Sequence, residues 1–227
     1  MEEKHCRIAH IIPLYCDSGF QEVFMKNIIT VQHTESLHHR NGMVGSWTDW
    51  PLSAAGRLQA EKIGEKLKEE TEGKEFVLYA SDLLRAKETA EILGRHLSTT
   101  PICRELLRER NLGKAVGKSV AWLRKHMECQ EKTVDDRLFS DAESRRDLWN
   151  RLAGFYEYVL ESDSENILIV SHGDTLSVFN ALFLNLEPEA LNGIDLFGMA
   201  GGVSFFQVNP EGKHIIRRLS DLSYVRS

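Results

Sequence analysis

Two short apolar runs constrain the fold of this chain more than any other feature. Ile28–Val31 is β-branched at every position, and Asn166–Val170 is apolar after its first residue. Neither run alternates apolar with polar residues, which is typical of strands buried on both faces of a parallel sheet. Phe76–Ala80 predicts a further strand. We therefore expect a central, mostly parallel sheet.

Amphipathic segments follow these strands. Ser53 is a candidate N-cap for a helix, and the apolar stripe of that helix contains small residues, which predict close packing on a sheet. Its members are Gly56, Ala60, Ile63, Gly64 and Leu67. Further helices are expected from about Asp82, over 144–161, and from Gly173 to about Leu186. Strands that alternate with helices predict an α/β fold, a three-layer α/β/α sandwich.

Two other regions complete the predicted organisation. Val203–Val208 and His214–Leu219, joined by an Asn-Pro-Glu-Gly turn, predict a closing hairpin. Residues 99–142 carry strong charge and few periodic signals, apart from a helix around Ser119–Cys129, and are interpreted as an insertion over the sheet. The prediction is a single domain over 25–227, preceded by an N-terminal extension of uncertain structure over 1–24.

Composition excludes several classes of function. The chain has 227 residues, of which 42% are hydrophobic and 27% are charged, as in ordinary globular domains. Its 28 Lys and Arg against 34 Asp and Glu give a net charge of −6, which argues against a nucleic-acid partner. Any anionic ligand must therefore be bound by a local cluster of cations.

The cysteines and the N-terminus indicate a cellular compartment. Four cysteines, with no C-x-x-C spacing, predict reduced, buried structural thiols: Cys6, Cys16, Cys103 and Cys129. The apolar run Ile8–Tyr15 contains His10 and Pro13, is too short to span a bilayer, and has an acidic flank unlike that of a signal peptide. We expect a cytoplasmic protein with no membrane partner.

Three strand ends carry residues suited to phosphate chemistry. His33 follows Ile28–Val31, His172 follows Asn166–Val170, and Arg85 lies soon after Phe76–Ala80. Ligands of open α/β sheets bind at the carboxyl ends of the strands. A neutral imidazole can act as a nucleophile, and a guanidinium matches the geometry of phosphate oxygens. We therefore expect these groups to converge in a phosphoryl-transfer site.

Fragments spread over about residues 27–224 together resemble the histidine phosphatase superfamily, which includes cofactor-dependent phosphoglycerate mutase and α-ribazole phosphatase. The fragments are Val31–Ser36, Gly45–Ser53 with Gly56 and Gln59–Ala60, Ser81–Ala90, Arg108–Gly113 and Val170–Gly173. Their order and spacing make the resemblance specific. It implies a phosphoglycerate mutase-like fold. For this chain we assign neither a cofactor nor a metal.

The resemblance also implies roles for individual residues. His33 is the histidine that becomes phosphorylated, Arg85 binds the phosphate, and His172 hydrogen-bonds the transferring phosphoryl group. Glu109, four residues before Gly113, is the proton donor. A carboxyl group in that role needs a raised pKa to be protonated near neutral pH. The alternative for Glu109 is an ion pair with Arg108 or Arg110 on a solvated segment.

The sequence departs from the family at the first fragment. Gln32-His33-Thr34 replaces the usual Arg-His-Gly, so that a neutral amide stands where the family has a phosphate-binding guanidinium. A charge-assisted hydrogen bond contributes ~1.5 to 3 kcal/mol, against ~0.5 to 1.5 kcal/mol for a neutral one. Arg40, Arg110 and Lys118 are candidates to compensate for the lost charge.

A second departure is His39, which stands where the family commonly has a phosphate-contacting asparagine; Asn41 is nearby but out of register. We include Gln32, His39, Asn41 and Arg110 as candidate substrate-binding residues. A loop with His38, His39 and His33 also raises the alternative of a zinc site, but no cysteine or H-E-x-x-H pattern accompanies it, so no metal is assigned.

The predicted function is hydrolysis of a small phosphorylated metabolite by a histidine acid phosphatase-like phosphomonoesterase. The shortness of segment 114–147, and the turn-like Asp141–Ser144 before the next helix, favour this over a phosphoglycerate mutase-type phosphotransferase. A catalytically weak phosphate-binding or regulatory protein is the other alternative. Specificity residues are expected within 99–142 and 187–202, with Asp195 and Trp122 as possible contacts, and the protein is expected to be a monomer or homodimer.

Overall fold

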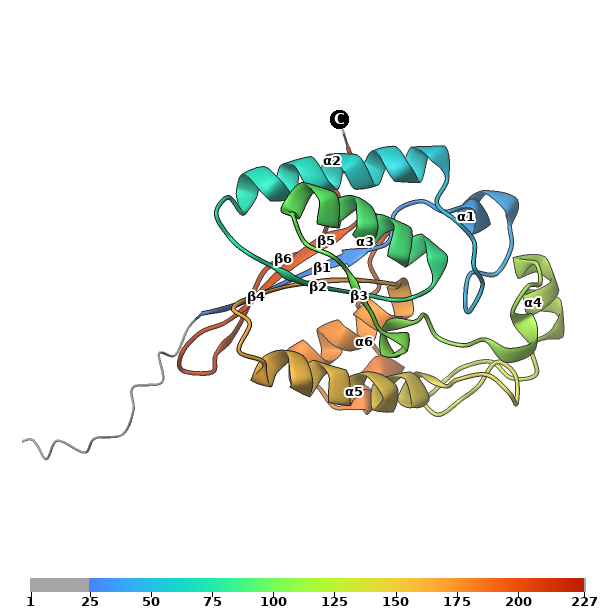
Figure 1. Ribbon diagram of the computed structural model, residues 1–227. Helices are drawn as coiled ribbons and strands as arrows, with labels where there is room; N and C mark the ends of the chain where they lie inside the picture. The colour runs from blue at the N-terminus through green and yellow to red at the C-terminus, as the bar shows by residue number, and fades with distance from the viewer. Residues whose placement is uncertain (1–24, 227) are drawn as a thin grey trace, which may run out of the picture.

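The computed structural model describes residues 25–226, which form an α/β fold around one six-stranded sheet (Figure 1). The strands are β1 (Lys26–Gln32), β2 (Val77–Ala80), β3 (Ile102–Cys103), β4 (Asn166–Ser171), β5 (Val203–Val208) and β6 (His214–Asp221). Their order in the sheet is β3-β2-β4-β1-β5-β6. The pairs β3-β2, β2-β4 and β4-β1 are parallel, whereas β1-β5 and β5-β6 are antiparallel. The mostly parallel sheet predicted from the sequence is confirmed.

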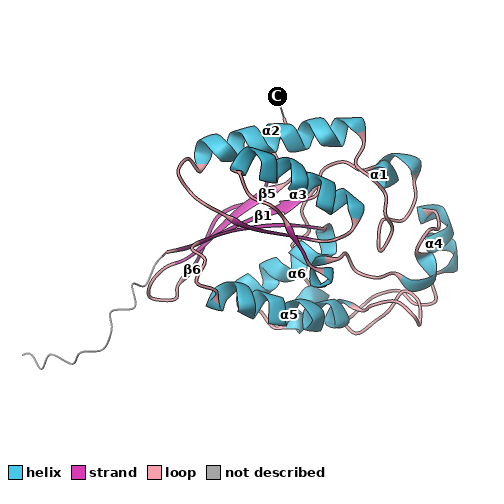
Figure 2. Ribbon diagram, in the orientation of Figure 1, coloured by secondary structure: helices cyan, strands magenta, loops and turns pink. Residues whose placement is uncertain are grey.

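Helices cover both faces of this sheet (Figure 2). They are α1 (Leu37–Asn41), α2 (Ala54–Glu70), α3 (Leu84–Leu97), α4 (Val120–His126), α5 (Arg145–Glu161) and α6 (Gly173–Phe183). Helices α2 and α3 lie on one face, α5 and α6 lie on the other, and α1 and α4 lie at one end of the molecule (Figure 1). The three-layer sandwich is therefore confirmed.

Strand β4 lies at the centre of the core. Ile167 and Ile169 pack with the apolar residues of α5 and α6, whereas Leu168 and Val170 pack with those of α2 and α3. All four side chains have no exposed surface. This burial on both faces explains why the run of apolar residues lacks alternation.

Several helix boundaries follow from local capping. The hydroxyl groups of Ser53, Ser119 and Ser144 each accept a backbone N–H from the first turn of α2, α4 and α5 respectively. The structure confirms these three helices. Helix α6 ends at Phe183, before the predicted end at Leu186.

The structure also differs from the sequence predictions. Helix α1 and strand β3 were not predicted, because α1 has five residues and no buried side chain, and β3 has two residues. Such short elements have no detectable period. Gly56 packs against the backbone of Glu35 and Gly64 against the ring of His96, so these small residues serve loop and helix contacts and not packing on the sheet.

The prediction of buried thiols was wrong where it can be examined. Cys129 is exposed and Cys103 is half-buried, because both lie in the charged region 99–142 at the edge of the fold. Cys6, Cys16 and the run Ile8–Tyr15 lie outside the described residues. Within the described part of the chain, no helix has the length and apolarity needed to cross a membrane.

Candidate active site

The register of β1 and β4 brings two histidines together. Gln32 pairs with Ser171, so that the residues following them, His33 and His172, lie at the same edge of the sheet. The His33 backbone N–H donates to the Ser171 carbonyl (2.9 Å), and the ring centroids of His33 and His172 lie 5.1 Å apart in an edge-on arrangement. Both side chains are buried. The convergence expected from the strand ends is therefore present.

Arg85 reaches the same point from the neighbouring strand. Ala80 of β2 pairs with Val170 of β4, and the chain then turns into α3, whose second residue is Arg85. The Nε of Arg85 donates to Nε2 of His33 (3.2 Å), and its two terminal nitrogens donate to the carbonyls of Thr48 and Ser46 (2.8 Å each). Arg85 is 1% exposed, and burial lowers its pKa to about 10.

These contacts define the tautomer of His33. A carbonyl oxygen only accepts, so Nδ1 of His33 donates its hydrogen to the Thr34 carbonyl (2.8 Å). The guanidinium only donates, so Nε2 of His33 carries a lone pair directed at Arg85. Burial, reinforced by the charge of Arg85, keeps the pKa of His33 well below its ordinary value. His33 is thus a neutral imidazole with Nε2 as its basic and nucleophilic atom.

Ser46 organises the loop that holds Arg85, and no sequence pattern indicated this role. Its backbone has a φ of +39°, a left-handed conformation that is costly for a residue other than glycine. The Ser46 carbonyl accepts from Arg85, while its hydroxyl donates to the Arg110 carbonyl (2.9 Å) and accepts the Leu112 N–H (2.8 Å). Ser46 therefore connects the Arg85 guanidinium to the segment that contains Glu109.

His172 has one occupied and one unpartnered ring nitrogen. Its Nε2 lies 2.8 Å from the hydroxyl of Ser81, the residue that follows β2. Its Nδ1 is buried and has no hydrogen-bond partner among the described residues. Burial, followed by the charge of Arg85, lowers the pKa of His172 well below its ordinary value. The ring is consequently neutral and leaves one nitrogen to contact a ligand. From the sequence, Ser81 was named only within the fragment Ser81–Ala90, and its contact with His172 was not predicted.

Backbone N–H groups hold Glu109, which forms no ion pair within residues 25–226. Its Oε1 accepts the Arg110 N–H (3.0 Å), and its Oε2 lies 3.4 Å from the Asp174 N–H. Its neighbour Arg108 pairs instead with Asp82. Burial, reinforced by the charge of Asp174, raises the pKa of Glu109 to about 7. The surface ion pair considered from the sequence is therefore absent among the described residues.

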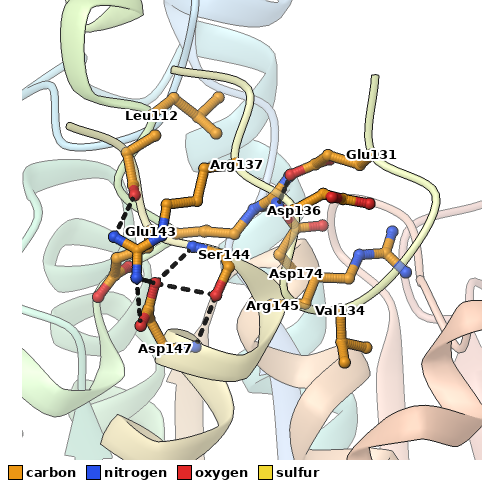
Figure 3. A network of polar contacts seen from close by, with 12 residues as sticks. Leu112, Glu131, Val134, Asp136, Arg137, Glu143, Ser144, Arg145, Asp147 and Asp174 are labelled. Atoms are coloured by element: carbon orange, nitrogen blue, oxygen red, sulfur yellow. Dashed lines mark hydrogen bonds and ion pairs between the residues drawn. The ribbon is translucent and has the colours of Figure 1, made fainter. Parts of the chain in front are cut away.

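Arg110 is bound by carboxylates on both sides. Its Nε lies 2.9 Å from Asp174 Oδ2, and its terminal nitrogens both contact the carboxylate of Glu131. Glu131 belongs to the insertion, and Arg137 of the same insertion pairs with Asp147, which forms a capping box with Ser144 at the start of α5 (Figure 3). Two carboxylates already balance the charge of this guanidinium, so Arg110, one of the candidates to compensate for Gln32, is not a free cation.

The histidines of α1 form an outer wall over His33. The His39 ring stacks on that of His33 with centroids 5.6 Å apart, and the His38 ring lies 3.9 Å from that of His39. The Nδ1 of His39 accepts the Ser36 N–H (3.2 Å), which leaves Nε2 as its donor. Asn41 is not part of this wall, because it is exposed and its side-chain oxygen accepts the Met43 N–H.

Gln32 is buried at the edge of the site, and its Oε1 has no hydrogen-bond partner among the described residues. The other proposed replacements for a lost cation lie outward. Arg40 is exposed and contacts Glu35 at 3.9 Å, and the Lys118 ammonium lies 5.7 Å from the centre of the Trp122 ring. Across residues 25–226, no cluster of three or more His, Cys, Asp or Glu side chains has an arrangement that could hold a metal ion.

This arrangement of an unprotonated imidazole, a buried guanidinium and a second histidine at the carboxyl edge of an α/β sheet defines a site of the histidine phosphatase class. The model of the histidine phosphatase superfamily (branch 1) matches residues 28–220, and the chain belongs to this family.

Relatives agree with this assignment, and a solved structure has the same fold. The chain is 28% identical over 166 residues to the uncharacterized phosphatase PhoE of Bacillus subtilis, covering 73% of this chain and 81% of that protein. It is 29% identical over 184 residues to a 2,3-bisphosphoglycerate-dependent phosphoglycerate mutase of Cytophaga hutchinsonii, covering 76% and 84%. The fold matches that of YhfR from Bacillus stearothermophilus, with a TM-score of 0.76, 24% identity, and coverage of 88% of this chain and all of that one.

Proposed function

We propose that the protein hydrolyses a small phosphate monoester through a phosphohistidine intermediate on His33. The observation that carries this proposal is the lone pair of His33 Nε2, directed at the Arg85 guanidinium at 3.2 Å. A phosphoryl group bound by Arg85 would meet that lone pair. The neighbouring unpartnered Nδ1 of His172 supports a further contact to a phosphoryl oxygen.

In the first step, His33 Nε2 attacks phosphorus while the bond from phosphorus to the ester oxygen breaks. The leaving alkoxide takes a proton from Glu109, whose pKa of about 7 keeps much of the carboxyl protonated near neutral pH. The Nδ1–H of His33 keeps its hydrogen bond to Thr34, which stabilises the ring as it becomes cationic. Arg85 balances the charge of the transferring group.

In the second step, water attacks the phosphohistidine. The Glu109 carboxylate accepts a proton from that water, the nitrogen–phosphorus bond breaks, and inorganic phosphate and neutral His33 are released. One carboxyl group therefore serves as acid and then as base. The names of the relatives, a phosphatase and a phosphoglycerate mutase, support phosphoryl chemistry in general and leave the substrate of this chain open.

The proposal is tested by phosphate release from an aryl phosphate in the presence of a chelator, with wild type and two variants. His33→Ala is expected to lose at least about a thousandfold in kcat, because it removes the nucleophile. His126→Ala is the matched control, since His126 is exposed on α4. Rapid denaturation at alkaline pH during turnover should capture phosphate on His33 in wild type and in His126→Ala, but not in His33→Ala.

Three outcomes would contradict the proposal. Full activity in folded His33→Ala would exclude His33 as the nucleophile. Absence of turnover over a broad panel of esters, with inorganic phosphate still bound, would favour a phosphate-binding or regulatory protein. Transfer of the trapped phosphate to phosphoglycerate faster than to water would instead indicate a phosphotransferase.

A further inference from the structure

The segment that precedes β5 forms one side of the candidate site. Because β5 runs antiparallel to β1, the start of β5 lies at the same sheet edge as His33. The Gly201 N–H donates to the carbonyls of Gln32 (3.0 Å) and His33 (3.2 Å). Four residues earlier, the Phe197 ring lies over Gly173, where an added Cβ would come within 2.3 Å of it. The segment therefore spans from the end of β1 to the residue after His172.

Two large apolar side chains of this segment are exposed. Phe197 is 55% exposed and Met199 is 61% exposed, and we call this pair the apolar rim. Their backbones are fixed, because the Phe197 N–H donates to Asp195 Oδ1 (3.0 Å) and the Met199 N–H donates to Ser220 Oγ (3.1 Å). Apolar surface held in place beside a catalytic site is suited to contact an apolar part of a ligand.

The charges around the site also favour a ligand with an apolar leaving group. Four arginines lie at this edge, and three of them are neutralised by carboxylates: Arg108 by Asp82, Arg110 by Asp174 and Glu131, and Arg151 by Glu143. Within residues 25–226, Arg85 is the member of this set that has no carboxylate within ion-pair distance. One guanidinium is therefore available for one phosphoryl group.

A second anionic group on the substrate would be poorly accommodated. Arg108, Arg110 and Arg151 are already paired with carboxylates, so they offer it no free guanidinium, and the Gln32 amide is neutral. An anion without a partner in a partly desolvated site is costly. A carboxylate or second phosphate on the leaving group is therefore disfavoured, whereas an uncharged chain or ring can cover Phe197 and Met199.

We propose that the substrate is a phosphate monoester whose leaving group is uncharged and largely apolar, and that Phe197 and Met199 contact that group. This inference rests on the proposed phosphomonoesterase activity and adds the chemical class of the alcohol. It makes Phe197 and Met199 specificity-determining residues, and assigns them no part in the bond-breaking steps.

The test uses straight-chain alkyl phosphates from ethyl to hexyl, because their leaving alcohols have similar reactivity and differ in apolar length. We expect kcat/KM to rise about twofold per added methylene, as for partly covered methylenes. A hexyl phosphate carrying a terminal carboxylate should react at least about tenfold more slowly than hexyl phosphate itself. Phe197→Ala and Met199→Ala should each reduce the dependence on chain length by about half.

Control variants separate contact from folding. Leu58→Ala removes a similarly exposed apolar side chain, 67% exposed on α2, and should leave the dependence on chain length unchanged. Phe197→Leu keeps an apolar side chain and should retain most of the wild-type dependence. Equal kcat/KM from ethyl to hexyl phosphate, or a preference for the carboxylated chain, would overturn the inference even if hydrolysis through His33 is established.

A binding experiment tests the inference independently of turnover. Calorimetric titration of the same alkyl phosphates into the His33→Ala variant reports affinity without hydrolysis. Affinity should increase with chain length in His33→Ala and fall when Phe197→Ala is added to that variant. This result would support contact between the apolar rim and the leaving group even if wild type hydrolyses no ester. Affinity independent of chain length would contradict it.

Discussion

Arg110 and Asp174 are joined by their side chains, Nε to Oδ2 at 2.9 Å, and both donate a backbone N–H to the carboxyl group of Glu109. The Glu109 carboxyl is thus held at its two oxygens by two residues that are themselves paired. The N–H groups favour its charged form, whereas burial and the nearby charge of Asp174 oppose it. The net result is a pKa of about 7 at a fixed position.

The first prediction concerns the pH dependence of ester hydrolysis. An acid that must be protonated loses activity as pH rises through its pKa, so kcat/KM for butyl phosphate should fall above about pH 7. An aryl phosphate has a good leaving group that needs little protonation. Its kcat/KM should therefore not fall as Glu109 loses its proton. Initial rates between pH 5 and 9 measure both profiles. Identical decreases for the two esters would exclude Glu109 as the acid.

The second prediction concerns Asp174. The Asp174→Asn variant removes a negative charge beside Glu109, which should lower the Glu109 pKa and move the alkaline decrease to lower pH. At pH 8 the kcat/KM for butyl phosphate should fall by about threefold, with little change for an aryl phosphate. Asp135→Asn, which removes an exposed carboxylate paired with Arg146, is the control. An unchanged profile in Asp174→Asn would refute this coupling.

The third prediction concerns stability in acid. The pKa of buried His33 is below 6.5 in the folded protein, so below pH 6.5 the unfolded chain binds a proton there that the folded protein does not. The free energy of unfolding should therefore decrease as pH falls below 6.5. Glu109 contributes with the opposite sign, because its raised pKa makes the folded form bind the extra proton between 4.5 and about 7.

Urea denaturation at pH 6.5 and 5.5 measures this difference. The loss between the two pH values should be about 1 kcal/mol smaller in His33→Asn than in wild type. His126→Asn, an exposed substitution, should behave as wild type. An equal loss in His33→Asn and wild type would show that His33 is protonated in the folded protein.

The fourth prediction compares two helical glycines. A Cβ at Gly56 would lie 1.9 Å from the Glu35 carbonyl oxygen, and this backbone atom cannot move without displacing the loop that follows His33. Gly56→Ala should therefore lower the free energy of unfolding by ~2 to 4 kcal/mol. Gly154→Ala on α5 meets no atom within 4 Å and should instead raise it by ~0.5 to 1 kcal/mol. An unchanged free energy of unfolding in Gly56→Ala would show that the contact between α2 and this loop can adjust to a side chain.

The fifth prediction concerns the departure at Gln32. Gln32→Arg places a cation near the phosphoryl site and should lower the inhibition constant of inorganic phosphate about fivefold, because a charge-assisted hydrogen bond replaces a neutral one. Gln130→Arg adds the same charge at an exposed position of the insertion and should have little effect. Weaker phosphate inhibition in folded Gln32→Arg would show that position 32 does not face the phosphate.

The sequence predicted the residues at the centre of the site better than the residues that hold them in position. His33, His172 and Arg85 follow strands that are recognisable from their apolar runs, so their meeting at one sheet edge could be inferred. Glu109 lies in an irregular segment and was assigned only through the family resemblance. The roles of Ser46 and Glu131 depend on a left-handed bend and on a contact across the insertion, which leave no periodic pattern in the sequence.

The parallel pairing of β1 with β4 has a consequence for folding. Asn27 pairs with Asn166, so the two strands that carry His33 and His172 are joined across most of the chain. Contacts of such long separation are costly in loop-closure entropy and slow to form. A shift of one residue in this pairing would turn every side chain of one strand to the opposite face. Recovery of activity during refolding should therefore report when this long-range pairing has closed in its correct register.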